Sequence, residues 1–280
     1  LGGREVRGAR PAALGRQIEA DRADGCVPFL VVGTAGSVST GAVDPLPAIG
    51  DLCRAKGLWF HVDAAYGGFA ASVPEAPDDL RALKDADSVA VDPHKWLYAP
   101  LEAGCALVRD PAALGGAFAY HPPYYHLDEA VANMVDFGMQ NSRGFRALKV
   151  WLALRHVGAD GYRTMISDDI RLSRALATAV EQHPELALLT QSLSITTFRF
   201  VPADLRASAG TASVETYLNA LNEKLLDAVQ RGGRAFVSNA VIAGKYALRA
   251  CIVNFRTGPG DVDALPGIVV ETGRQIGAAL

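Results

Sequence analysis

The sequence predicts an α/β fold with a mostly parallel sheet, followed by a smaller α+β unit. Short apolar runs typical of buried strands lie at 27–32, 58–62 and 88–91, and segments with a helical pattern separate them. Such alternation is typical of β-α-β units, in which helices cover both faces of a parallel sheet. Towards the C-terminus the order changes to strand, helix, two strands and helix, which predicts a separate compact unit.

The N-terminal elements are a helix and a buried strand. A helix with an amphipathic pattern is expected over 11–22. The continuous apolar run 27–32 is typical of a central parallel strand. It leads into a loop of glycine and hydroxyl residues, 33–41, which can approach a ligand closely. An ordinary Gly/Ser connection is the alternative interpretation.

A second helix and strand follow. Asp44 is the expected N-cap of the helix, Pro45 its first residue, and Gly57 lies just beyond its end. The apolar run 58–62 is the next strand, and Asp63 follows it directly.

The third strand and its surroundings come next. A short helix is expected over 78–84, a strand over 88–91, and an antiparallel strand over 105–108. Between 118 and 144 the pattern is irregular, and a connection of this length is usually functional or disordered.

The C-terminal half has a longer helical pattern. Gly158 is the expected boundary, which gives domains over 1–158 and 159–280. The elements expected around and after it are helices over 145–156, 162–182, 214–231 and 261–276, and strands over 194–201, 235–242 and 246–253.

Composition narrows the functional class. The chain has 280 residues, half of them hydrophobic, and a net charge of −3, which argues for a large core and against a nucleic-acid-binding surface. No apolar stretch approaches the ~18–20 residues of a membrane span. The four cysteines are scattered, without the close pairs of a zinc site or a dense disulfide framework. We expect buried free thiols, no metal, and a cytoplasmic location.

Lys95 is the first candidate catalytic residue. The strand at 88–91 stops before Pro93, and His94 and Lys95 lie just past its end. A lone lysine after a strand is usually a solvated charge. However, Asp63 follows the neighbouring strand, and the carboxyl ends of parallel strands meet at the edge where ligands bind. A lysine and a carboxylate there suit pyridoxal phosphate, because the lysine can hold its aldehyde as a Schiff base and the aspartate can keep its pyridine nitrogen protonated.

Two motifs carry a resemblance to a known family. The strings HVDAAYGGF at 61–69 and DPHKW at 92–96, in this order and spacing, resemble the group II pyridoxal-phosphate-dependent decarboxylases, which include the aromatic-L-amino-acid, tyrosine, histidine and glutamate enzymes. The likeness continues through 146–151. It implies the pyridoxal-phosphate-dependent transferase fold type I, a small C-terminal α+β domain, an amino-acid substrate, and a homodimer with the active site at the subunit interface.

The resemblance also implies roles for residues around Lys95. Asp63 would lie beside the ring nitrogen and Ala65 beneath the ring, while Lys95 would bind the cofactor and later act as an acid or base. His94 would contact the cofactor phosphate or orient Lys95, and a purely structural histidine is the alternative. Asp92 stands where family members commonly have asparagine, and it would add negative charge near the site.

Two loops complete the expected site. In the loop 33–41, Thr34 and Ser37 are candidates for cofactor contact; because Val38 stands where many members have a second threonine, the hydroxyl that meets the cofactor stays open. In the segment 118–144, Tyr124 or Tyr125 matches a mobile-loop tyrosine that helps to protonate the product, often in the partner subunit's site. A rigid Pro-aromatic surface loop is the alternative.

The resulting functional hypothesis is decarboxylation of an L-amino acid to the amine and CO2 through a Lys95 Schiff base. Trp96 and the Pro-Pro-Tyr-Tyr string at 122–125 favour the aromatic branch. The alternatives are another fold type I carbon–carbon lyase or an aldehyde-forming decarboxylase, and a non-catalytic remnant. Family members carry a substantial region before this point of the alignment, so we expect an N-terminally truncated fragment whose cofactor binding and activity stay open.

Overall fold

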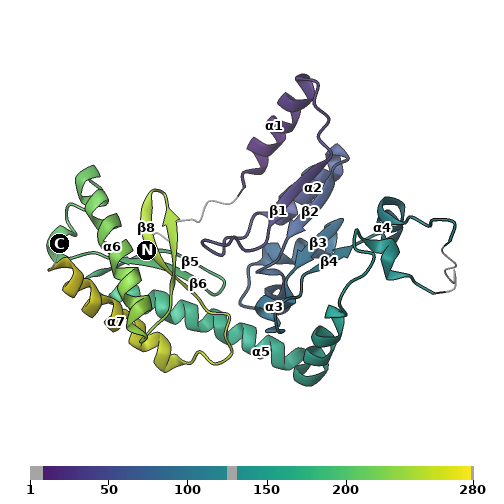
Figure 1. Ribbon diagram of the computed structural model, residues 1–280. Helices are drawn as coiled ribbons and strands as arrows, with labels where there is room; N and C mark the ends of the chain where they lie inside the picture. The colour runs from purple at the N-terminus through teal and green to yellow at the C-terminus, as the bar shows by residue number, and fades with distance from the viewer. Residues whose placement is uncertain (1–8, 125–130, 279–280) are drawn as a thin grey trace.

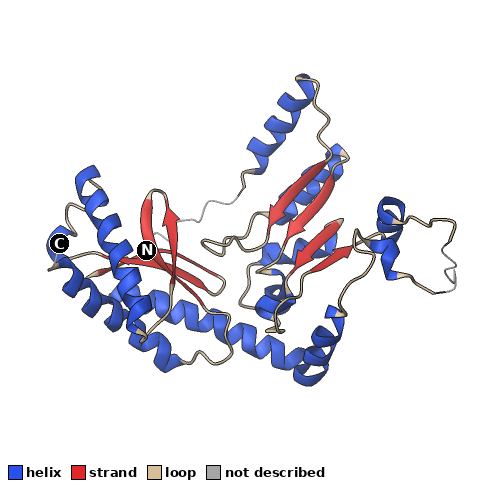
Figure 2. Ribbon diagram, viewed as in Figure 1, coloured by secondary structure: helices blue, strands red, loops and turns tan. Residues whose placement is uncertain are grey.

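The computed structural model describes residues 9–124 and 131–278, and it contains two four-stranded sheets (Figure 1). The two sheets lie towards opposite ends of the molecule, and a long helix, α5, runs alongside both (Figures 1 and 2). The predicted α/β class with a following α+β unit is therefore confirmed.

The first sheet is mostly parallel, as the sequence predicts. Its strand order is β1-β2-β3-β4, with β1, β2 and β3 parallel and β4 antiparallel to β3. The strands are β1 (Leu30–Thr34), β2 (Trp59–Asp63), β3 (Ser88–Val91) and β4 (Cys105–Val108). The helices that precede or connect them are α1 (Pro11–Ala23), α2 (Leu46–Lys56), and the 3-10 helices η1 (Gly68–Ser72) and η2 (Asp78–Asp85).

Strand β1 corrects the expectation of a central strand at 27–32. It starts at Leu30 and lies at the edge of the sheet. Val27, Phe29 and Val32 are 85%, 74% and 50% exposed, although the faces of parallel sheets are usually buried. The apolar run was interpreted from its composition alone, and composition does not determine whether a neighbouring strand is present.

The start of α2 is also corrected. The N-cap is Pro45 rather than Asp44, and no side-chain cap is formed. The Asp44 carboxylate instead accepts the backbone N–H groups of Thr34 (2.8 Å) and Ala9 (2.7 Å). The predicted end is confirmed, because Gly57 adopts the left-handed conformation (φ 67°).

The segment between β4 and α5 projects away from the first sheet (Figure 1). It begins with a helix that the sequence analysis did not identify, α4 (Pro111–Phe118), capped by the Asp110 carboxylate on the N–H of Ala112. A 3-10 helix, η3 (Met134–Phe137), interrupts its irregular remainder.

The second half contains an antiparallel sheet of order β5-β6-β8-β7. The two expected helices at 145–156 and 162–182 form one element, α5 (Arg146–Gln182), interrupted at Gly158 (φ 72°, ψ 169°). Strand β5 was not predicted. The other elements are β5 (Leu186–Ser192), β6 (Ile195–Phe200), η4 (Ala203–Leu205), α6 (Ala212–Gly232), β7 (Ser238–Ile242), β8 (Lys245–Cys251) and α7 (Pro259–Gly277). A domain boundary at 158 stays a proposal.

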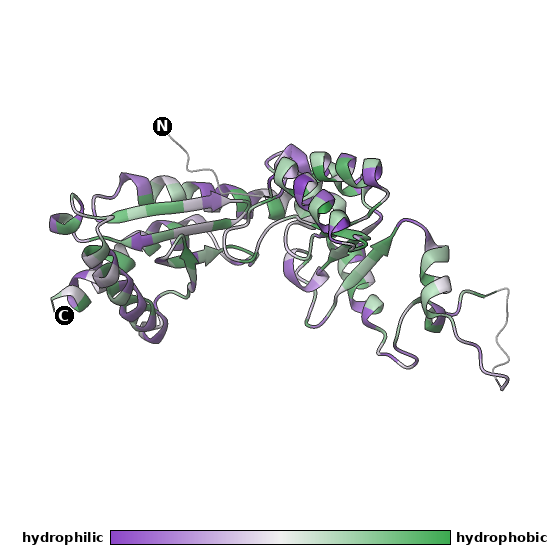
Figure 3. Ribbon diagram, turned by 90° about the horizontal axis from the view of Figure 1, so that it is seen from above, coloured by the Kyte–Doolittle hydropathy of each residue, from purple (hydrophilic) through white to green (hydrophobic). Residues whose placement is uncertain are grey.

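Two apolar cores form, one beside each sheet, and α5 contributes to both. Hydrophobic residues occur along the strands of both sheets (Figure 3). Ile166 and Ile170 pack in the first core, and Leu176 and Val180 pack in the second. The two halves therefore share one helix.

The thiols and the helices bear on two further expectations. Cys26 and Cys105 are exposed, contrary to the expectation of buried thiols, whereas Cys53 is buried and Cys251 half-buried.

Among the residues that the structure describes, no helix combines the length and the apolar character that a bilayer span requires.

Candidate active site

The carboxyl ends of three neighbouring strands form the candidate site. Thr34 at the end of β1 is in register with Asp63 at the end of β2, and Asp63 is in register with Ala90 of β3. Adjacent strands lie ~4.8 Å apart, so the residues that follow these positions emerge at one edge of the sheet. The predicted adjacency of the Asp63 and Lys95 strands is confirmed.

Backbone hydrogen bonds join the three turns beyond these strands. The N–H of Ala35 donates to the carbonyl of Asp63 (2.8 Å), and the N–H of Ala64 donates to that of Ala90 (2.9 Å). One step further, the N–H of Asp92 donates to the carbonyl of Ala65 (3.2 Å). The aspartate turn and the lysine turn are thus held together by main-chain contacts.

Lys95 lies in a single helical turn, α3 (Pro93–Trp96), directly after β3. Its Nζ is 2.7 Å from Oδ2 of Asp92, and the lysine side chain is 39% exposed. The amine is therefore ion-paired, yet open to a ligand.

His94 contacts the other side of the same turn. Its Nδ1 is 2.7 Å from the carbonyl oxygen of Ala103, and its Nε2 is 3.8 Å from Oδ2 of Asp92. The imidazole and Lys95 thus approach the same carboxylate oxygen, which is consistent with an orienting role. A contact between His94 and a phosphate stays a prediction.

Asp63 is exposed at the end of β2, and its Oδ1 accepts the N–H of Ala65 (3.1 Å). Ala65 itself is half-buried. A carboxylate fixed by its own turn and open to solvent can pair with a cationic group on a ligand.

The loop after β1 approaches the Asp63 turn very closely. A Cβ on Gly67 would lie 2.3 Å from the carbonyl oxygen of Ala35, so only glycine fits there. Within the loop, the Ser37 hydroxyl is 2.8 Å from that of Thr40 and accepts the N–H of Ala42 (3.2 Å). Ser37 is half-buried, and so is Thr34 at the strand end.

Buried aromatic residues pack against the lysine turn on its core side. Trp96 is fully buried and stacks on Tyr66, with ring centroids 4.8 Å apart. The Tyr66 hydroxyl is 2.7 Å from that of Ser194, in the second half of the chain. Trp96 Nε1–H donates to Oδ2 of Asp169 in α5 (2.8 Å). No local sequence pattern pointed to Tyr66, Asp169 or Ser194 as parts of this support.

Burial perturbs two groups of this support. It raises the pKa of Asp169 to about 6, although hydrogen bonds from Tyr98 and Trp96 oppose the shift. Burial likewise raises the pKa of the Tyr66 hydroxyl well above its usual range. Tyr66 therefore stays neutral and acts only through hydrogen bonds and packing.

Tyr124, one of the two expected loop tyrosines, is not part of this arrangement of turns. Tyr124 lies on the segment that projects from the first sheet and is 74% exposed. Tyr125 lies outside the described residues. A role for either tyrosine stays a prediction.

The groups at this edge fit pyridoxal phosphate. They provide one open amine at Lys95, one open carboxylate at Asp63, a small residue at Ala65 between them, and hydroxyls at Thr34 and Ser37. These are the partners that an aldehyde, a pyridinium N–H, a flat ring and a phosphate require: an amine, an accepting carboxylate, a small apolar residue and donating hydroxyls.

Comparison with known proteins agrees with this fit. Residues 4–201 match the family described as "Pyridoxal-dependent decarboxylase conserved domain". An aromatic-L-amino-acid decarboxylase of Bacillus atrophaeus is 35% identical over 251 residues, covering 88% of this chain and 51% of the relative. A phenylacetaldehyde synthase of Arabidopsis thaliana is 32% identical over 248 residues, covering 87% of this chain and 49% of the relative.

Solved structures show the same relationship. The chain is similar to Oryza sativa TDC with PLP and tryptamine, at 29% identity and a TM-score of 0.87, covering 96% of this chain and 55% of that one. Mouse CSAD in apo form has 30% identity and a TM-score of 0.89, covering 96% of this chain and 57% of that one. The chain thus spans about half the length of the curated relatives it matches.

Proposed function

The chain belongs to the pyridoxal-dependent decarboxylase family, and from this premise we propose that it carries the cofactor-binding lysine of an amino-acid carboxy-lyase. The proposal is that the reaction releases CO2 from an L-amino acid and leaves the amine. One observation carries it: the turns of Asp63 and Lys95 meet at one sheet edge and are joined by the Asp92–Ala65 hydrogen bond.

Pyridoxal phosphate, when bound, supplies an electron sink for the bond that breaks at the substrate Cα. Lys95 would hold its aldehyde and Asp63 its ring nitrogen, with Ala65 against the ring. Thr34, Ser37 and His94 are the proposed contacts to its polar groups. Tyr124 or Tyr125 is proposed to reach the reacting centre from the projecting segment.

The chain's own side chains would manage protons and orientation. Asp92 holds the Lys95 amine at 2.7 Å, which fixes where the lysine can deliver or accept a proton. The Asp63 carboxylate is anchored through the N–H of Ala65, so it would face a bound cation without reorganising. Holding the substrate carboxylate perpendicular to the ring plane would select decarboxylation over transamination.

Aromatic amino acids are the proposed substrates. The relatives that support this are the aromatic-L-amino-acid decarboxylase and a tryptophan decarboxylase of Camptotheca acuminata, at 34% identity. The phenylacetaldehyde synthase supports a second candidate, an aldehyde-forming reaction. Incubation with phenylalanine, tyrosine or tryptophan separates the two. The first reaction yields amine and CO2 without an oxidant, whereas the second consumes dioxygen and water and yields aldehyde, ammonia, CO2 and hydrogen peroxide.

A second copy of the chain is the proposed partner. Large apolar side chains are exposed near the start of α5: Phe145 (76%), Trp151 (57%) and Leu152 (52%), with Leu101 (80%) on the loop after the lysine turn. A monomer rarely leaves such a group uncovered. This surface supports a homodimer with the site near its interface.

Borohydride trapping tests the proposed function. The purified chain is incubated with pyridoxal phosphate, reduced, digested and examined by mass spectrometry. We expect a phosphopyridoxyl group on the peptide that contains Lys95, lost in Lys95→Ala and kept in Lys84→Ala, which removes an exposed lysine. Modification that persists at the same level in Lys95→Ala would refute the assignment.

A further inference from the structure

Asp169 is a buried carboxylate that contacts the lysine turn from α5. It is 3% exposed, and one oxygen, Oδ2, accepts both Trp96 Nε1–H (2.8 Å) and the Tyr98 hydroxyl (2.6 Å). Both donors belong to the turn that carries Lys95. Over the described ranges 9–124 and 131–278, no lysine, arginine or histidine forms an ion pair with Asp169.

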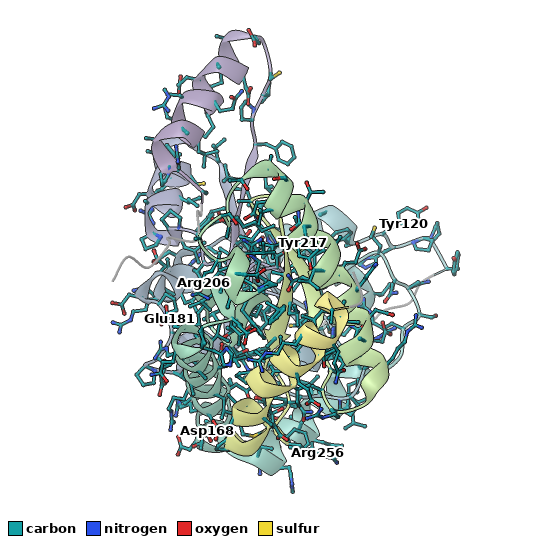
Figure 4. All side chains as sticks on the ribbon, turned by 90° about the vertical axis from the view of Figure 1, so that its left-hand side faces the viewer. Tyr120, Asp168, Glu181, Arg206, Tyr217 and Arg256 are labelled. Atoms are coloured by element: carbon teal, nitrogen blue, oxygen red, sulfur yellow. The ribbon has the colours of Figure 1, made fainter. Side chains whose placement is uncertain are left out.

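The next residue of the same helix shows the contrast. Asp168 is exposed at the surface of α5 (Figure 4) and pairs with Arg171 at 3.3 Å. Two adjacent aspartates thus occupy opposite environments. Burying a carboxylate without a cation costs free energy, because an ionised group loses its hydration on burial. What Asp169 provides in return is the fixed position of the two side chains that donate to it.

The backbone that Asp169 holds is strained. Tyr98 has a φ of +50°, a conformation that residues other than glycine rarely adopt and that persists only when the surroundings impose it. The hydroxyl of Tyr162, also in α5, donates to the carbonyl of Leu97 (3.1 Å). Residues 96, 97 and 98 are therefore each tied to α5.

We propose that Asp169 is a positioning residue for Lys95, which acts by fixing Trp96 and Tyr98 and thereby the turn that directs the amine to Asp92. The proposal rests on the proposed function for its purpose, since a positioned amine matters where a cofactor binds. The position of Lys95 can nevertheless be measured without any cofactor.

The ionisation of Asp169 provides a second readout. Its pKa of about 6 means that it gains a proton between pH 7.5 and 5.5, which makes it a weaker acceptor. Tyr98 faces it from the turn, Cys251 from β8, and Asp168 from its own helix. Glu75 lies against a different face of α5, where it accepts the Ser167 hydroxyl.

The test measures how fast Lys95 reacts with a small amine-selective acylating reagent in the absence of pyridoxal phosphate. Brief labelling of the folded chain at pH 7.5, followed by peptide mass spectrometry, gives the rate at Lys95 relative to the exposed Lys84. We expect Asp169→Ala to accelerate labelling at Lys95 by about fivefold or more, because the turn loses two hydrogen bonds to a charged acceptor.

Two further variants make the result specific. Asp169→Asn keeps an oxygen acceptor, so we expect labelling about twofold faster than wild type at pH 7.5 and close to wild type at pH 5.5, where Asp169 is mostly protonated. Ser173→Ala is the matched control, because it removes a buried hydrogen bond between α5 and Thr196 (2.8 Å), away from the lysine turn. We expect no acceleration in this control.

Three outcomes would overturn the proposal. They are an unchanged Lys95 rate in Asp169→Ala, an equal acceleration in Ser173→Ala, and a ratio between Asp169→Asn and wild type that is the same at both pH values. If Asp169→Ala does not fold, that ratio alone decides. Because no cofactor is used, failure here is distinct from failure of the borohydride test.

Discussion

The two sheets of this protein differ in how completely the chain covers them. All six residues of β6 are buried, and helices α5, α6 and α7 contribute to the core around that sheet. In β1, by contrast, only one of five residues is buried, and large apolar side chains beside it face solvent. The candidate site nevertheless lies at the incompletely covered sheet. The turn that carries Lys95 is held in part by α5, a helix that also packs in the well-covered half.

A matched pair of phenylalanine truncations gives the largest expected contrast between the sheets. Phe198 in β6 is fully buried, so Phe198→Ala should lower the free energy of unfolding by about 3–5 kcal/mol. Phe29, before β1, is 74% exposed, so Phe29→Ala should change it by less than about 0.5 kcal/mol. Urea unfolding measures both values.

Tryptophan fluorescence shows whether the first half of the chain unfolds together with the second. All three tryptophans, Trp59, Trp96 and Trp151, precede residue 158. If α5 couples the halves, Phe198→Ala should shift the tryptophan transition as well as the circular-dichroism transition. A tryptophan transition that does not move would show that the sheets unfold independently, and a large cost for Phe29→Ala would show that the edge is covered in solution.

The pH dependence of stability tests the contact between α5 and the lysine turn, and the expected effect is of intermediate size. The pKa of Asp169 is about 6 in the folded chain and 3.8 for an ordinary aspartate, so between these values the folded state binds a proton that the unfolded state does not. Stability from this group is therefore present below pH 4 and is lost as the pH rises to 6. The stability of wild type minus that of Asp169→Asn should fall by about 2–3 kcal/mol from pH 4 to 7.

Asp168→Asn is the control for this measurement. Asp168 is exposed, and its replacement should leave the pH trend of the difference nearly flat. A flat difference for Asp169→Asn too would mean that the carboxylate is hydrated in solution.

The smallest expected effect concerns the open sheet alone. Asp44→Asn removes one of two carboxylate acceptors that hold the N–H groups of Thr34 and Ala9, which should cost about 1 kcal/mol. Asp51→Asn breaks only an exposed pair with Arg54 and should cost less than about 0.5 kcal/mol. Equal unfolding midpoints for the two variants would contradict this difference.

The parts that could be predicted from the sequence depend on local patterns. Strand 88–91 agrees to the residue, and the adjacency of the Asp63 and Lys95 strands followed from one β-α-β unit. Asp169 and Ser194 could not be found in this way, because they lie 73 and 128 positions from their partners Trp96 and Tyr66. The side-chain roles assigned to Lys95 and its neighbours stay predictions until they are tested.

Other differences have equally physical causes. Asp44 has the residue type of an N-cap, but the nearby N–H of Thr34 competes successfully for its carboxylate. The run before β1 has the composition of a central strand, yet edge or centre depends on which strands lie beside it. The local sequence pattern predicts that an element forms. Whether it lies at the edge or the centre, and what its side chains bind, depends on residues distant in the sequence.

The break at Gly158 has a consequence for how α5 serves two purposes. Before it, the helix presents apolar residues such as Trp151 to solvent; after it, Ile166 and Ile170 enter the core. A continuous helix would lock these two stripes into one angular relation at 100° per residue. Because Gly158 interrupts the helix, the direction of one stripe does not determine the direction of the other. The exposed stripe can therefore change in evolution while the buried stripe still faces the lysine turn.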